Sequence, residues 1–154
     1  MFLGILQKSK LSLKKTKLSL KKDRVSVVVA TPEETHGFPD TVVQHVRAHP
    51  LDHHLVSVDE NLDIIKESGD KSTVSGSQSI VDLRQTLHAE GLEAKLLAIV
   101  RSANDSSADR AFYRDRAHGF LAKTPLKRDS VLNTLAPIWL SRFPHALSFE
   151  TREI

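Results

Sequence analysis

Two short stretches in the last third of the chain decide its fold. Residues 96–105 read LLAIVRSAND, and residues 119–125 read GFLAKTP. Each opens with apolar residues typical of a buried strand and ends in a polar side chain, Ser102 in the first and Lys123 in the second. A polar helical segment separates them, so we expect the two strands to run parallel. Their polar ends then share one sheet edge, where a hydroxyl and an ammonium group suit an anion such as phosphate.

The rest of the chain repeats this alternation of short apolar strands and amphipathic helices. Four strands are expected, at residues 25–30, 55–58, 96–100 and 120–122. Four helices are expected, from Asp40 to about Pro50, from a cap at Ser77 or Ser79 to Gly91, from 106 to 117 and from 129 to 140, with Pro137 as a kink or stop. Residues 63–75 are polar and predict a loop or short insertion. This order predicts an α/β fold with an open parallel sheet and helices on both faces.

The composition indicates one intracellular domain. A chain of 154 residues is long enough for one core and short for two. It has no cysteine, which excludes disulfides and thiolate metal sites and fits a cytoplasmic location. No apolar run approaches the roughly 20 residues of a membrane-spanning helix, so no transmembrane segment is expected.

Basic residues are concentrated at the beginning of the chain. Residues 1–24 hold eight Lys or Arg and one acid, a net charge of +7, whereas the remainder carries −4. The sequence therefore predicts a basic leader (1–24), a globular domain (25–140) and a tail (141–154). Because the excess positive charge lies outside the domain, we do not expect nucleic acid as its partner.

The leader contains a seven-residue repeat, KLSLKK at residues 10–15 and again at 17–22. Its leucines share a face only with a period of two, which favours a strand or extended arm over a helix. A solvated arm is the first interpretation. The alternative is an arm that binds nucleic acid or an anionic membrane, with an affinity that falls as salt rises.

Asp59 is the candidate nucleophile. It directly follows the apolar strand at 55–58, so its carboxylate is expected at the same sheet edge as Ser102 and Lys123. A carboxylate beside fixed positive charge is the arrangement that phosphoryl transfer to an aspartate requires.

Four segments together resemble the receiver domain of two-component response regulators and hybrid histidine kinases. They are Asp59-Glu60-Asn61-Leu62, Ser75-Gly76-Ser77, Ser102-Ala103-Asn104-Asp105 and residues 119–125, with Thr124 inserted before the proline of the last. The resemblance covers residues 25 to 140 and is most specific over 96–126. It implies a flavodoxin-like fold.

The resemblance also implies a function in a phosphorelay. Asp59 would accept a phosphoryl group as an aspartyl phosphate, Lys123 would pair with that group, and Ser102 would donate a hydrogen bond to it. Phe120 matches the aromatic switch position, and Mg²⁺ would bind with Asp59 as one ligand. The phosphoryl donor would be a histidine kinase or a histidine phosphotransfer protein. A second copy of this chain, in a homodimer, is a further candidate partner. Such a domain is no enzyme beyond its own phosphotransfer and dephosphorylation.

One departure from the family concerns the metal. Receivers carry two acids after their first strand, but residues 25–30 are followed by Thr31-Pro32. Either the acids are lost, or this strand is the family's second and the leader replaces the first strand and helix. We favour the second explanation, with residues 10–13 or 17–20 as the substitute strand. Glu33, Glu34 or Glu60 would then be the remaining candidates for a metal ligand.

Two alternatives remain open from the sequence. A degenerate pseudo-receiver would use the same fold as a protein-interaction module without phosphorylation. Asp52-His53-His54 contains metal-ligand residue types, but neighbouring histidines before a strand point to opposite faces, which argues against a shared metal.

Overall fold

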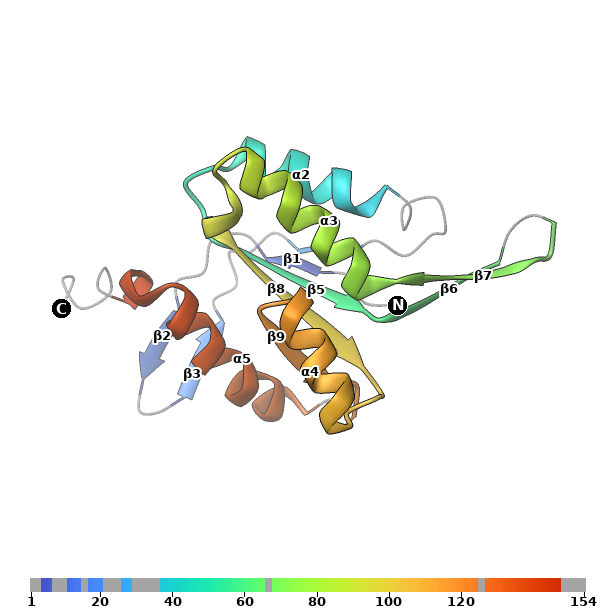
Figure 1. Ribbon diagram of the computed structural model, residues 1–154. Helices are drawn as coiled ribbons and strands as arrows, with labels where there is room; N and C mark the ends of the chain where they lie inside the picture. Colours follow the sequence, from blue (N-terminus) through green and yellow to red (C-terminus); the bar gives the residue numbers. More distant parts are fainter. Residues whose placement is uncertain are drawn as a thin grey trace.

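A five-stranded sheet with helices on both faces forms the centre of the protein (Figure 1). The computed structural model describes residues 4–6, 11–14, 17–20, 26–28, 37–65, 68–124 and 127–147. The strand order is β4-β1-β5-β8-β9, from Ser26–Val28, Gly4–Leu6, His54–Asp59, Leu96–Ser102 and Gly119–Ala122. The expected mixed α/β architecture with a small open parallel sheet is confirmed.

The parallel part of the sheet is β5, β8 and β9. Asp59 is opposite Arg101 in the β5–β8 register, and Ser102 is opposite Ala122 in the β8–β9 register. The carboxyl ends of these three strands therefore meet at one edge, as predicted. β1 runs antiparallel to both of its neighbours, β4 and β5, so the sheet is mixed rather than wholly parallel.

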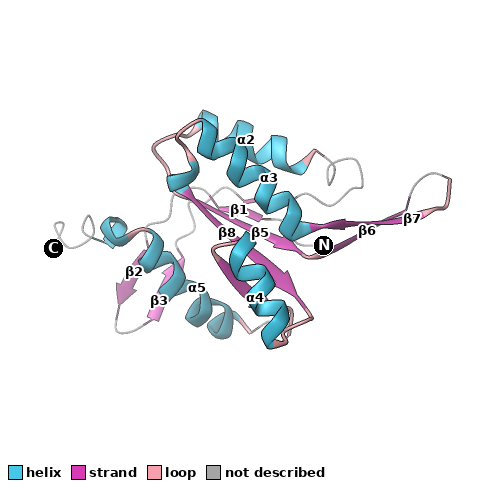
Figure 2. Cartoon of the chain, in the orientation of Figure 1, coloured by secondary structure: helices cyan, strands magenta, loops and turns pink. Residues whose placement is uncertain are grey.

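Alternation of side chains along the strands creates a core on each face of the sheet. On one face, Val56, Val58 and Val100 pack beneath α2 (Phe38–Ala48), α3 (Gly76–Ala89) and α4 (Ser107–Arg116). On the other face, Leu97 and Ile99 pack against α5 (Arg128–Arg142). Figure 2 shows these helices on the two sides of the strands.

Residues 63–75 were predicted as a loop or short insertion, and the loop interpretation is wrong. β6 (Asn61–Ile65) and β7 (Lys71–Ser75) form an antiparallel hairpin that projects from the body of the molecule (Figure 1). Gly69, between the strands, adopts a φ of 84° that favours glycine. The segment is mostly polar because a hairpin that projects from the body of the molecule packs little against the core. It therefore lacks the apolar alternation by which strands are recognised in a sequence.

The described parts of the leader repeat are extended, as its period of two predicted, but the substitute strand was assigned wrongly. Within the described residues, β2 (Leu11–Lys14) and β3 (Lys17–Leu20) form a sheet of two strands, apart from the central sheet, and β3 lies beside α5. The position between β4 and β5 is taken by β1, which has no lysine and can therefore enter a buried sheet.

Several helix ends differ from their predicted positions. Ser75, rather than Ser77 or Ser79, caps α3 by accepting a hydrogen bond from the Gln78 amide. α2 begins at Phe38, with Pro39 in its first turn, where a missing N–H costs nothing. α5 continues past Pro137 to Arg142, and the short 3-10 helix η2 (Pro144–Leu147) follows. α4 has its N-cap at Ser106, the residue at which the helix was predicted to begin.

No helix in the described part of the chain is long and apolar enough to cross a membrane.

Candidate functional site

Asp59 and Lys123 meet at the carboxyl edge of the sheet, as the sequence predicted. Asp59 is the last residue of β5, and Lys123 directly follows β9. The Lys123 Nζ lies 3.3 Å from Asp59 Oδ2, and the lysine side chain remains about one-third exposed. The backbone amide of Lys123 donates to the Ser102 carbonyl, which continues the β8–β9 pairing and fixes the base of the lysine side chain.

Arg101 is a second cation at this site, and the sequence analysis did not single it out. It is paired with Asp59 in the strand register, so both side chains project from the same face of the sheet. Its Nη1 lies 3.6 Å from Asp59 Oδ1, and both side chains are 11% exposed. Among the described residues, buried Arg101 Nε and Asp59 Oδ1 have no hydrogen-bond partner. Thus one carboxylate lies between two cations and retains unused hydrogen-bonding capacity.

Ser102 lies at the predicted edge, but its hydroxyl bonds toward α4. Its Oγ accepts hydrogen bonds from the Tyr113 hydroxyl at 3.1 Å and from the Asn104 amide at 3.0 Å. Ser102 is 2% exposed. A hydroxyl that accepts two hydrogen bonds still has its own hydrogen to donate, so Ser102 remains a potential donor to an anion.

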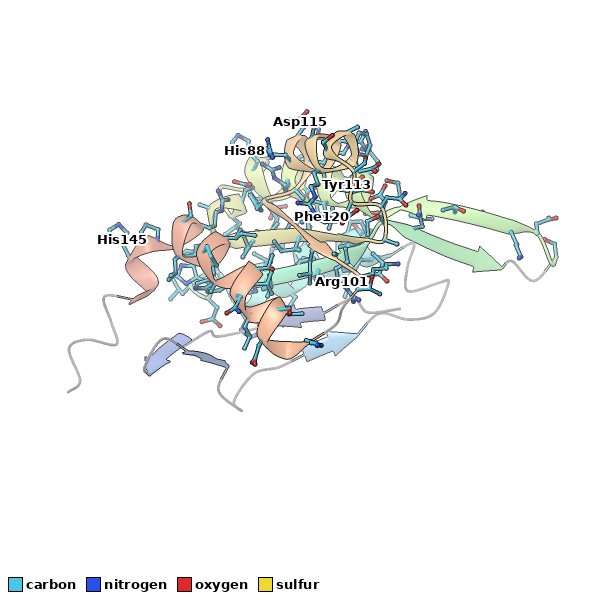
Figure 3. All side chains as sticks on the ribbon, turned by 90° about the horizontal axis from the view of Figure 1, so that it is seen from below. His88, Arg101, Tyr113, Asp115, Phe120 and His145 are labelled. Atoms are coloured by element: carbon cyan, nitrogen blue, oxygen red, sulfur yellow. The ribbon has the colours of Figure 1, made fainter. Side chains whose placement is uncertain are left out.

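Phe120, the predicted switch residue, stacks on Tyr113. The two ring planes are 3° apart in angle, with centroids separated by 5.5 Å, and the Arg110 guanidinium lies over Phe120. Figure 3 shows Tyr113 and Phe120 on the α4 side of the sheet and Arg101 on the other side. Tyr113 therefore connects the Ser102 hydroxyl to the Phe120 ring.

Glu60 holds the beginning of α3 against the end of β5. Its carboxylate accepts hydrogen bonds from the Ser77 amide, the Ser77 hydroxyl and the Ser75 hydroxyl. A carboxylate at a helix N-terminus is stabilised by the unpaired amides and by the helix dipole. This placement commits Glu60 to the helix.

The described residues do not fit a magnesium site at Asp59. Magnesium prefers several oxygen ligands, but Asp59 faces Arg101 and Lys123, and Glu60 is bonded to α3. Over the described ranges, no group of three or more His, Cys, Asp or Glu side chains has an arrangement suited to a metal ion. Glu33 and Glu34, named above as candidate ligands, lie outside the described residues.

His53, directly before β5, and His54, the first residue of β5, point to opposite faces, as expected. His53 packs on Phe143, with ring centroids 4.3 Å apart, on the α5 side. His54 is fully buried near His45 of α2, and its Nε2 is 3.0 Å from the His49 carbonyl. Burial lowers the pKa of both His53 and His54.

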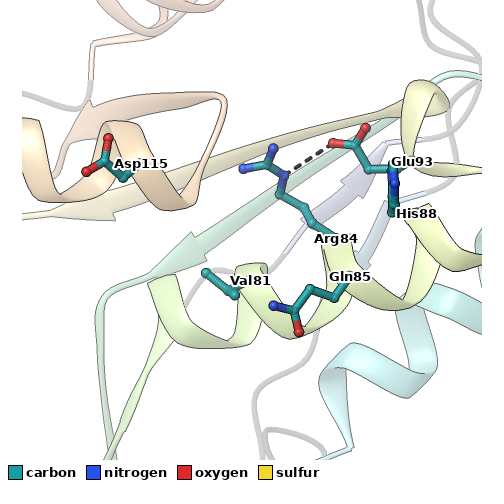
Figure 4. A pocket seen from close by; sticks show the side chains of 6 residues that line it. All are labelled: Val81, Arg84, Gln85, His88, Glu93 and Asp115. Carbon is teal, nitrogen blue, oxygen red and sulfur yellow. Dashed lines mark hydrogen bonds and ion pairs between the residues drawn. The ribbon is translucent and has the colours of Figure 1, made fainter.

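A shallow pocket of about 420 Å³ lies away from Asp59, on the outer side of α3. Figure 4 shows side chains that line it, among them His88, Asp115 and Arg84, which pairs with Glu93 at 3.2 Å. It contains none of the residues of the Asp59 site, so we assign no role to it in the chemistry at the sheet edge.

The sequence indicated the strand ends but not the contacts around them. Arg101 was detectable as a charge within an otherwise apolar strand, yet its pairing with Asp59 depends on register, which a single sequence does not reveal. Tyr113 carried no signal beyond an aromatic residue in a polar helix.

The chain matches no protein-family model, and neither the curated proteins nor the solved structures gave a significant match.

Proposed function

We propose that this protein is a receiver-like signalling domain of a phosphorelay, in which Asp59 accepts a phosphoryl group from a phosphohistidine partner. The observation that carries the proposal is the 3.3 Å contact between the Asp59 carboxylate and the Lys123 ammonium group. A nucleophilic carboxylate, a fixed cation and the Ser102 hydroxyl at one sheet edge are the groups this reaction uses.

The strand order supports the same proposal. Read along the sheet, β4, β1, β5, β8 and β9 follow the order 2-1-3-4-5 of flavodoxin-like folds. Ligands of such folds bind beyond the carboxyl ends of the strands, which is where Asp59 and Lys123 lie. The antiparallel direction of β1 is the departure from that fold. The donor would be a histidine kinase or histidine phosphotransfer protein in the cytoplasm.

The contacts of Ser102 suggest how phosphorylation would be read out. If the Ser102 hydroxyl turned toward a phosphoryl oxygen, its hydrogen bond from Tyr113 would weaken. Tyr113 stacks on Phe120, so the change would pass to the outer surface of α4 and β9. That surface is the expected docking face for a partner.

A second candidate function is a pseudo-receiver that docks to partners without phosphorylation. The observation that favours it is the Arg101–Asp59 ion pair, because a carboxylate already neutralised by arginine can serve a purely structural purpose.

Acetyl phosphate distinguishes the two candidates. We expect the folded protein to gain the mass of one phosphate, stable in acid and removed by base or hydroxylamine, as expected of an acyl phosphate. Asp59→Asn should abolish the gain, whereas Asp115→Asn, at an exposed position on α4, should leave it unchanged. If the wild-type protein gains no phosphate under any condition tested, the pseudo-receiver is the better description.

A further inference from the structure

The positive charge at the Asp59 site comes from side chains on and next to the strands of the sheet. Arg101 and Lys123 both lie within 4 Å of the carboxylate, so the three side chains carry a net charge of +1. The nearest acid along the chain, Glu60, directs its carboxylate to Ser75 and Ser77 at the start of α3. The described site therefore attracts a phosphate group and repels any cation beyond Arg101 and Lys123.

The geometry of Arg101 adds to the effect of its charge. A guanidinium presents several N–H donors in a fixed plane and suits phosphate oxygens better than a lysine does. Here Nη1 faces Asp59 Oδ1, while Nε is buried and has no acceptor in the described part of the chain. An incoming phosphoryl oxygen would supply that missing acceptor. The Arg101 guanidinium, which pairs with the Asp59 carboxylate, can therefore also bind the phosphoryl group.

We propose that Arg101 replaces the divalent cation of this site, so that Asp59 is phosphorylated without a metal ion. The inference rests on the proposed function and concerns how that function is carried out. In the step, an Asp59 carboxylate oxygen forms a bond to the phosphorus of a phosphoryl donor such as acetyl phosphate. The bond between phosphorus and the acetate oxygen breaks, and its electron pair leaves with acetate. Arg101 and Lys123 balance the negative charge on the transferred oxygens.

The first test compares rates of phosphate gain with acetyl phosphate, in excess EDTA and in excess magnesium. We expect the wild-type protein to react at the same rate in both. A reaction that proceeds in magnesium and stops in EDTA overturns the inference but leaves the proposed function intact. No reaction in either condition overturns the proposed function, and the inference with it.

The second test removes the guanidinium. Arg101→Gln should slow the reaction in EDTA on the order of a hundredfold, the usual cost of losing one preorganised donor to a developing negative charge. Arg101→Lys should retain part of the rate, because a lysine keeps the positive charge but lacks the planar set of N–H donors. Arg114→Gln is the matched control, since Arg114 is exposed on α4. An unchanged rate in Arg101→Gln overturns the inference.

Folding of the variants is checked by near-ultraviolet circular dichroism, for which buried Trp139 is the reporter. If Arg101→Gln does not fold, the comparison of EDTA with magnesium on the wild-type protein still decides the question.

Discussion

At Gly76, the first residue of α3, the helix lies directly against the end of β5. A Cβ atom placed on it would lie 2.1 Å from the Asp59 carbonyl oxygen and 2.7 Å from Val58 Cγ1. The backbone at Asp59 is held by pairing with β8, and the Gly76 amide donates to the Glu60 carbonyl, so neither side can easily retreat. Gly76 therefore allows the helix to begin beside the candidate site.

Gly76→Ala should lower the free energy of unfolding by about 1–3 kcal/mol, the usual range for overpacking a core. Urea unfolding followed by the fluorescence of buried Trp139 measures the change. Gly119→Ala is the matched control, because the three atoms nearest its Cβ would be side-chain methyl groups of Ile138 and Ile99 rather than backbone. A larger loss in Gly119→Ala than in Gly76→Ala would contradict the argument.

At the residue scale, the sequence predicted that Asp59, Ser102 and Lys123 lie at one sheet edge, but it did not predict the second positive charge of the candidate site. Asp59, Ser102 and Lys123 were found because each ends a recognisable apolar run, and strand ends of a parallel sheet must coincide. Arg101 and Tyr113 were missed as partners because their roles depend on contacts between separate elements. Side-chain partners of this kind follow from packing, which no local pattern encodes.

At the element scale, the Glu93 carboxylate joins four parts of the structure. Glu93 begins η1 (Glu93–Lys95) and bonds to Arg84 of α3, Arg142 of α5 and His118 before β9. Burial works to raise the pKa of Glu93, but hydrogen bonds and charge from Arg142, His118 and Arg84 together lower it. The His118 Nδ1 also accepts a hydrogen bond from the Ala98 amide. In the neutral ring the hydrogen is therefore on Nε2, which donates it to the Glu93 carboxylate.

Protonation of His118 should therefore destabilise the fold. Burial, followed by the charges of Arg142 and Arg84, lowers the pKa of His118 to about 4. Between pH 6.5 and 4 the unfolded chain then binds more protons than the folded one, so stability is lost as the pH falls through this window. After allowance for solvent screening, we expect His118 to account for on the order of 2 kcal/mol of this loss.

Urea unfolding at several pH values between 4 and 7 measures this effect. His118→Gln is less stable at neutral pH but does not titrate, so its stability should fall less steeply with acid. His45, His53 and His54 also have lowered pKa values and act in the same direction in both proteins, so the difference between the two profiles reports His118 together with its hydrogen bond to Glu93. Parallel profiles would show that His118 is not responsible.

Elements with a continuous local signal were predicted best. β8 opens with five consecutive apolar residues, 96–100, and α4 has a serine cap with acidic and basic residues at the appropriate ends. β6 and β7 were missed because the segment from 63 to 75 is mostly polar, and β1 because a three-residue strand has too short a pattern to recognise. β1 forms by pairing with β4 and β5, which lie far along the chain, so the evidence for it is not local.

At the scale of the whole molecule, β1 joins the outer strand β4 to the rest of the sheet. It pairs with β4 on one side and with β5 on the other, with Ile5 opposite both Val27 and Val56. In the described part of the chain, β4 has no other strand partner. Without β1, β5 would become an edge strand with unpaired backbone groups, although it carries Asp59 at its end.

A chain that lacks residues 2–8 should therefore be less stable and prone to self-association. Hydrogen exchange should accelerate at those amides of Leu55, Val56 and Ser57 that point toward β1, because their acceptors are lost. The amides of β8 are the internal control, since β8 keeps both neighbours, β5 and β9, and should remain protected. Size-exclusion chromatography at several concentrations would detect pairing of the exposed edges. Unchanged exchange at β5 together with a monomeric truncated chain would mean that β1 is not needed to hold the strand that carries Asp59.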